Sequence, residues 1–131
     1  MIGLLRRLFA GGGALGQRGE RLAEGYLKRR GYRILRRGYT AGRDEADLVA
    51  VDPDGRTLVI VEVKTRRSDA PPPEANINRT KQYRLARLAD RLLREPSLRD
   101  CPLRFDAVSI VWPADGVPQV RHFQDAFEAP W

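Results

Sequence analysis

Two segments of the chain carry apolar residues at the spacing of an amphipathic helix. In the first, from about residue 16 to residue 30, four apolar side chains fall on one arc, and Gly31 follows as a stop signal. In the second, from about residue 78 to residue 94, five apolar side chains form a stripe, and Pro96 ends the helix. The two apolar faces consist of Leu22, Ala23, Tyr26 and Leu27 and of Leu85, Leu88, Ala89, Leu92 and Leu93. The pattern therefore predicts two helices with one buried face each.

Five other segments have the character of strands, at about residues 32–39, 46–51, 57–63, 103–112 and 117–123. The turn sequence Asp52–Gly55 joins the second and third and predicts an antiparallel hairpin. Residues 58–61 are all apolar, which is typical of a central strand covered on both faces. The proline-rich stretch 66–75 is predicted to be a loop. The order of elements predicts a single α/β domain over residues 16–131, a mixed five-stranded sheet flanked by helices, preceded by a flexible tail of residues 1–15.

Composition narrows the classes of protein that fit this pattern. A length of 131 residues suits one domain. A single cysteine, Cys101, excludes an internal disulfide framework and a thiolate zinc site, and a single histidine, His122, makes zinc hydrolase and Ser-His-Asp chemistry hard to assemble. No window approaches the roughly 18–20 consecutive apolar residues of a membrane helix. We therefore expect a cytoplasmic protein with no membrane partner.

Charge is unevenly distributed along the chain, which carries 24 Lys and Arg against 17 Asp and Glu. Residues 1–43 have a net charge of +9 and residues 66–99 of +5, whereas residues 44–65 between them have −4 and residues 100–131 have −3. A nucleic-acid enzyme needs this arrangement, since arginines hold the phosphate backbone while carboxylates hold a metal. A plain nucleic-acid-binding protein gains nothing from clustered carboxylates. The alternative for the positive net charge is an arginine-rich genome composition and a solvated surface.

Three residues of the acidic segment carry the candidate chemistry. Glu62 and Lys64 are two apart on a predicted strand, so their side chains lie on the same face. Asp47, on the partner strand of the hairpin, can lie beside Glu62. Two converging carboxylates repel each other unless a cation lies between them, and hard oxygen ligands favour Mg²⁺ or Mn²⁺. Lys64 could orient a water or stabilise charge on a phosphate. The alternative is an exposed strand with an ordinary Glu–Lys salt bridge.

Asp47 followed by Glu62-Val63-Lys64 resembles the Asp…(Asp/Glu)-x-Lys signature of restriction-endonuclease-like nucleases. From about residue 16 to residue 127, the chain more specifically resembles the YraN-like family of small, uncharacterised bacterial proteins. The stretches that carry this resemblance are Gly19–Ala23, Gly31–Leu35, Glu45–Val49, Val61–Arg66, Lys81 and Arg104–Asp106. One departure is Asp44, which stands where the family usually has glycine.

The resemblance implies a Holliday-junction-resolvase-like nuclease core. It implies that Asp47 and Glu62 bind the metal, that Lys64 is the catalytic lysine and that Glu20, on the first helix, is a further acidic ligand. For Glu20, the alternative is an acidic residue that the helix dipole favours in the first turn. Resolvases act as dimers, so the analogy also implies a homodimer.

The resulting hypothesis is a metal-dependent nuclease that hydrolyses phosphodiester bonds in DNA or RNA. Phosphate contacts are expected from basic residues after the third strand and on the second helix: Arg66, Arg67, Lys81 and Arg84. The alternatives are a catalytically silent nucleic-acid-binding protein with the same fold, and an adaptor whose basic faces bind acidic protein or ribosomal RNA. Asp106 is predicted to be the buried partner of an arginine rather than catalytic, and His122 a surface or edge-strand residue.

Overall fold

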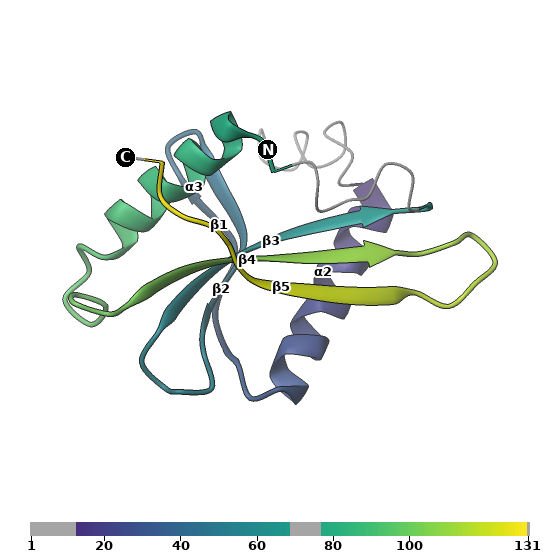
Figure 1. Ribbon diagram of the computed structural model, residues 1–131, viewed down its shortest axis with the longest axis horizontal. Helices are drawn as coiled ribbons and strands as arrows, with labels where there is room; N and C mark the ends of the chain where they lie inside the picture. The colour runs from purple at the N-terminus through teal and green to yellow at the C-terminus, as the bar shows by residue number, and fades with distance from the viewer. Residues whose placement is uncertain (1–12, 69–76, 131) are drawn as a thin grey trace.

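The structure is a computed structural model that describes residues 13–68 and 77–130; residues 1–12, 69–76 and 131 lie outside the described residues. Two helices and five strands follow one another in the predicted order (Figure 1). They are α2 (Gly13–Arg29), β1 (Arg33–Ala41), β2 (Asp44–Val51), β3 (Leu58–Arg66), α3 (Arg79–Leu92), β4 (Leu103–Val111) and β5 (Gln119–Phe127). No helix within these described ranges is long and apolar enough to cross a membrane.

The five strands form one mixed sheet in the order β1-β2-β3-β4-β5. Neighbouring strands are antiparallel except β3 and β4, which are parallel and are connected through α3. A parallel pair needs such a crossover, because the chain must return to the end of the sheet where it started. The predicted single α/β domain with a mixed five-stranded sheet flanked by helices is confirmed.

The two helices cover opposite faces of the sheet, as Figure 1 shows. On β3, Val59, Val61 and Val63 pack in the core under α2, whereas Leu58 and Ile60 pack in the core under α3. Successive side chains of a strand point to opposite faces, so a central strand between two helices must be apolar throughout. The expectation of a central strand covered on both faces is confirmed for this segment.

Helix and turn ends follow local sequence signals. The Asn78 side chain caps α3 by accepting a hydrogen bond of 2.9 Å from Lys81 N. Gly31 follows α2 with φ +91°, a conformation that favours glycine. In the β2–β3 hairpin, Asp52 N donates to Thr57 O at 2.9 Å, and Gly55 has φ +74°. The predicted helix stop and the predicted hairpin turn are both confirmed.

Several boundaries differ from the sequence prediction. Helix α2 begins at Gly13, inside the predicted tail of residues 1–15, of which residues 1–12 lie outside the described residues. Strand β2 begins at Asp44 rather than at residue 46, because pairing with β1 continues to Ala41. Strand β3 continues to Arg66 because its parallel pairing with β4 continues that far. Strand β5 runs from Gln119 to Phe127 rather than from 117 to 123. Pairing with a neighbour, which the sequence pattern does not show, decides these ends.

Candidate active site

The candidate site lies where strands β2 and β3 stop pairing. Their register runs from Val51 opposite Leu58 to Leu48 opposite Val61 and continues no further, although β3 stays paired with β4 up to Arg66. The next residue of β2, Asp47, fills the gap with its side chain: Oδ2 accepts a hydrogen bond of 2.7 Å from Val63 N. A carboxylate oxygen thus replaces the strand partner that this amide would otherwise have. The two strands open at Asp47 and Glu62, the two predicted carboxylates.

Glu62 is buried on the α3 face of the sheet. Its side chain is only 4% exposed, and Oε2 lies 3.0 Å from Nζ of Lys81 in the first turn of α3. The capping bond from Asn78 fixes the start of α3 and therefore the position from which Lys81 extends. The structure thus places the predicted phosphate-binding residue Lys81 against a candidate metal ligand, a contact that sequence reasoning missed. Strand β3 ends at Arg66 and α3 begins at Arg79, and the spacing in sequence between them gave no signal for this contact.

The surroundings of Glu62 disfavour the ionised form of its carboxyl group. Burial, the charge of Asp47 and a hydrogen bond between the two carboxyl groups raise the pKa of Glu62 well above its ordinary value, and Lys81 opposes the shift. Burial lowers the pKa of Lys81, but nearby negative charges, that of Glu62 above all, outweigh burial, so the pKa of Lys81 is raised. Glu62 Oε2 has ion-pair distance to Lys81 but receives no hydrogen bond from a correctly oriented donor. A buried oxygen without a donor is costly, and a cation or a proton relieves that cost.

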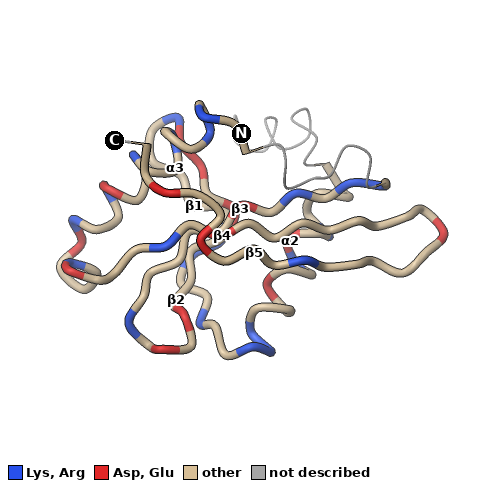
Figure 2. The backbone as a smooth tube through the Cα atoms, in the orientation of Figure 1, with Lys and Arg blue, Asp and Glu red and all other residues tan. Residues whose placement is uncertain are grey.

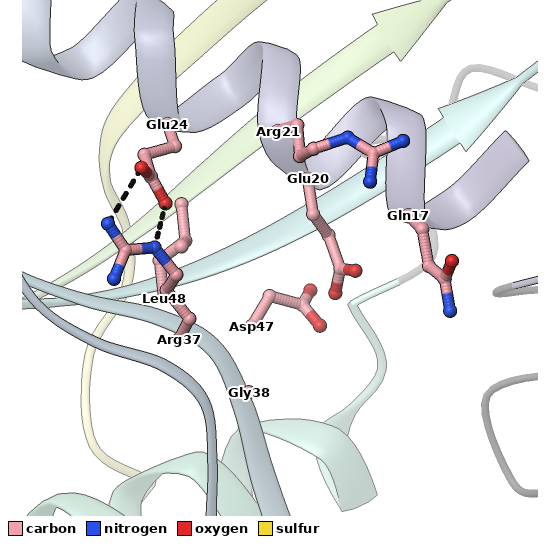
Figure 3. A pocket seen from close by; sticks show the side chains of 8 residues that line it. All are labelled: Gln17, Glu20, Arg21, Glu24, Arg37, Gly38, Asp47 and Leu48. Carbon is pink, nitrogen blue, oxygen red and sulfur yellow. Dashed lines mark hydrogen bonds and ion pairs between the residues drawn. The ribbon is translucent and has the colours of Figure 1, made fainter. Parts of the chain in front are cut away.

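Helix α2 brings Glu20 to the other side of Asp47. The approach of α2 to the sheet depends on Gly19, because a Cβ at this position would lie 1.9 Å from Thr65 Oγ1 on β3. The next residue, Glu20, lines a pocket of about 200 Å³ together with Asp47 and Gln17. Figure 3 shows the carboxylates of Glu20 and Asp47 directed into the same space. The structure therefore brings Glu20 and Asp47 together from two different elements.

Lys64 lies two residues beyond Glu62 on the same face of β3, half-buried and opposite Ser109 of β4. Among the described residues, none forms an ion pair with the ammonium group of Lys64. Within residues 13–68 and 77–130, no group of three or more His, Cys, Asp or Glu side chains is arranged to hold a metal ion. The residues present nevertheless fit a hard cation in two respects: Asp47 and Glu62 supply carboxylate oxygens, and the Lys81 ammonium approaches the buried Oε2 of Glu62 in poor hydrogen-bond geometry.

The other predicted phosphate-binding residues surround this region without converging on one point. Arg66, at the end of β3, donates to Thr65 O at 3.2 Å, and Arg67 donates to Trp112 O at 3.2 Å. Arg84 is exposed on α3. Their role as nucleic-acid contacts stays a prediction.

A second polar cluster, which sequence reasoning predicted only in part, lies on the α2 face of the sheet, where Asp106 of β4 pairs with Val61, the residue before Glu62. Arg104 binds Asp106 through Nε at 2.8 Å and Nη2 at 2.9 Å, which confirms the prediction that Asp106 is the buried partner of an arginine. Arg104 also contacts Asp52 at 2.7 Å and the Tyr32 hydroxyl at 2.8 Å. His122 lies on the edge strand β5, as predicted, but not at the surface: its side chain is 7% exposed and its Nε2 lies 2.8 Å from Asp106 Oδ2.

Known proteins of similar sequence extend over most of the chain. A protein of Geotalea uraniireducens is 42% identical over 116 residues, which are 88% of this chain and 90% of its own. One from Arthrobacter sp. FB24 is 44% identical over 112 residues, 84% of this chain and 92% of its own. Both carry the name UPF0102 protein.

Among solved structures, "The structure of Pyrococcus furiosus SfsA in complex with Ca2+" matches with a TM-score of 0.36 and 16% identity. The match covers 84% of this chain and 62% of that protein. The sequence profile described as "Uncharacterised protein family UPF0102" matches residues 19–110, a range that includes Glu20, Asp47, Glu62 and Lys64. The YraN-like resemblance is thereby confirmed, and the chain belongs to the family UPF0102.

Proposed function

We propose that this protein is a metal-dependent nuclease with a restriction-endonuclease-like core, hydrolysing phosphodiester bonds in DNA or RNA. The observation that carries the proposal is the opening between β2 and β3, where Asp47 and the buried Glu62 lie together. A protein that needed this region only for stability would gain by replacing Glu62 with an apolar residue, because the carboxylate is buried beside a second carboxyl group, that of Asp47.

Each candidate residue has a distinct role in this proposal. Asp47 and Glu62 would hold Mg²⁺ or Mn²⁺, with Glu20 as a further ligand from α2. The bound ion would polarise the phosphate and lower the pKa of a water. Lys64 presents its ammonium group on the Glu62 face, where it would stabilise charge on the phosphate. Lys81 balances the charge of Glu62 from α3.

Nucleic acid would be held by basic residues around the opening. Arg66, the last residue of β3, and Arg67 follow Lys64 after one intervening residue, and Arg84 lies one helical turn after Lys81. Cutting both strands of a duplex or a junction requires two such sites, so the proposal includes a homodimer.

The test is a cleavage assay on single-stranded DNA, duplex DNA, a four-way junction and structured RNA, each with Mg²⁺, Mn²⁺ or EDTA. Asp47→Asn keeps an oxygen that can accept the bond from Val63 N, and Lys64→Met keeps the length of the side chain. Each is expected to lower the cleavage rate by about 100-fold or more. Lys28→Met, which removes a lysine from the far end of α2, is the matched control and should cut at the rate of the unmodified protein.

Metal-dependent cutting lost in both site variants supports the proposal. If cutting is absent on every substrate while salt-sensitive binding persists, the catalytic proposal is wrong. The protein is then a catalytically silent nucleic-acid-binding protein with this fold.

A further inference from the structure

Three arginines on one flank of α3 surround a single buried carboxylate. Arg87 binds Asp44, the first residue of β2, through two hydrogen bonds of 2.8 Å, and the Asp44 side chain is 3% exposed. The guanidinium of Arg91 lies against the tip of the β1–β2 hairpin, since its Nη1 would be 3.5 Å from a Cβ placed on Gly42. Figure 2 shows the basic positions along α3 and the hairpin tip beside it. We name Arg84, Arg87 and Arg91 the α3 arginine cluster.

The α3 arginine cluster carries more positive charge than its surroundings neutralise. The hydrogen bonds from Arg87 hold the pKa of Asp44 below its ordinary value against the effect of burial, and the charges of Arg87, Arg84 and Arg91 act in the same direction. All three guanidinium groups are therefore within electrostatic range of one carboxylate. Arg84 and Arg91 are exposed and form no ion pair with any described residue. Like charges held this close favour the binding of an anion.

Several basic residues packed on or beside α2 lack this surplus. Lys28 and Arg37 both pair with Glu24, and Arg30 lies over the ring of Tyr26 at 3.5 Å. Arg18 lies over the ring of Trp112 at 4.3 Å. Arg21 and Arg29 of α2 are exposed as well, so what distinguishes the α3 arginine cluster is its arrangement around the buried Asp44.

The α3 arginine cluster extends along the helix away from the candidate active site. Lys81 contacts Glu62, and Arg84, Arg87 and Arg91 follow at about 5, 9 and 15 Å along the helix axis, given a rise of ~1.5 Å per residue. Arginine binds phosphate oxygens with two parallel hydrogen bonds, and such contacts fix the position of a nucleic acid without reading its sequence.

We propose that the α3 arginine cluster binds consecutive phosphates of the nucleic-acid strand that enters the candidate active site, and so sets the direction in which substrate leaves along α3. The inference rests on the proposed function for its choice of partner.

The test measures binding separately from cleavage. In an Asp47→Asn background, fluorescence anisotropy follows the binding of a labelled DNA oligonucleotide, single-stranded or duplex, at several salt concentrations. Arg84→Ala/Arg91→Ala is expected to weaken binding by about tenfold and to reduce the slope of log Kd against log salt by roughly 2. Arg56→Ala/Arg99→Ala removes the same charge from exposed positions elsewhere and should change Kd by less than about twofold. Arg84→Lys/Arg91→Lys should retain the salt slope, because the charges remain.

Equal weakening by both alanine pairs would overturn the inference, since net charge alone would then explain binding. Stronger competition by polyglutamate than by unlabelled oligonucleotide would overturn it in favour of an acidic protein partner. Failure of the nuclease proposal gives a different result. If no substrate is cleaved but Arg84→Ala/Arg91→Ala selectively loses binding, the nuclease proposal is wrong and the cluster proposal is supported. If the background protein binds no oligonucleotide, the cluster proposal is wrong.

Discussion

Two buried carboxyl groups on neighbouring strands and opposite faces of the sheet have opposite electrostatics. Asp106 is fully buried and receives four hydrogen bonds, two from Arg104, one from His122 and one from Asp125 N. Burial alone would raise the pKa of Asp106, but these donors hold it below its ordinary value. Glu62, 4% exposed, has one lysine and a second carboxyl group as neighbours, and its pKa is raised.

The difference separates a carboxylate that stabilises the fold from one that is available to a ligand. The donors around Asp106 compensate for the loss of water, so its charge holds β4 and β5 together. The surroundings of Glu62 supply one lysine, in poor hydrogen-bond geometry, and a second carboxyl group, so folding alone does not explain why the charge is there. The depth of burial is nearly the same; the number of donors distinguishes the two.

The largest effect on stability is expected at Asp106. Asp106→Asn leaves Arg104, whose side chain is 19% exposed, with only Asp52 as a charged partner, and should lower the free energy of unfolding by about 3 kcal/mol. Chemical denaturation followed by circular dichroism measures this loss. Cleavage per folded molecule should stay unchanged, and a selective loss of cleavage would contradict the structural role.

A smaller effect of opposite sign is expected at Glu62. Glu62→Gln removes a buried charge beside Asp47, while Lys81, with 34% of its side chain exposed, stays solvated. In EDTA at neutral pH, the variant should be more stable by on the order of 1 kcal/mol, measured by the same denaturation experiment. The rise in Tm that Mg²⁺ or Mn²⁺ produces in the unmodified protein should be lost. A variant less stable than the unmodified protein would show that Glu62 is a structural residue like Asp106.

A substitution at Lys81 tests the difference between Glu62 and Asp106 indirectly, and its expected effect is smaller. Lys81→Met removes the cation nearest to Glu62, which competes with a metal ion for Oε2, so Mn²⁺ should bind about threefold to tenfold more tightly. Isothermal titration calorimetry measures the affinity without any turnover. Lys28→Met removes the lysine of another Lys–Glu pair, at 2.9 Å on α2, and should leave the affinity unchanged. Weaker Mn²⁺ binding in Lys81→Met would contradict the competition.

The smallest effect is a difference in pH dependence between the two carboxyl variants. The folded pKa of Asp106 is depressed, so its stabilisation is present above the unfolded value of 3.8 and is lost as pH falls through the folded value. The folded pKa of Glu62 is raised, so ionisation destabilises the fold increasingly as pH rises from the model-peptide value of 4.5 through the folded value. The loss in Asp106→Asn should therefore shrink in acid, and the gain in Glu62→Gln should vanish there. Denaturation curves from pH 3 to pH 8 would show parallel, pH-independent offsets if neither shift exists.

Local rules were enough to predict a part of this structure. The turn at Asp52–Gly55, the helix stop at Gly31 and the shared face of Glu62 and Lys64 depend on neighbours a few residues away. Asp106 could be read as buried because it interrupts an apolar strand. In each case, the short-range pattern contains the physical cause.

The candidate site depends on contacts that the pattern does not contain. The hydrogen bond from Val63 N to Asp47 forms only because β2 and β3 stop pairing at Leu48 and Val61, and the pairing register is a property of the whole sheet. The contact of Lys81 with Glu62 depends on how α3 lies across the sheet. The burial of His122 on its edge strand could not be predicted for the same reason, because the rings of Tyr26 and Tyr32 pack against it from distant segments.

Because Gly19 has no side chain, α2 can lie close to the sheet, and the geometry of the candidate site depends on this position. Since a single methyl group there would collide with Thr65, a substitution has to displace either Thr65 or α2, and Glu20 moves wherever α2 is displaced. A change that touches neither metal nor substrate would then alter the distance between two carboxylates. Substitutions at Gly19 therefore offer laboratory evolution a way to shift α2 relative to the sheet without altering any charged residue.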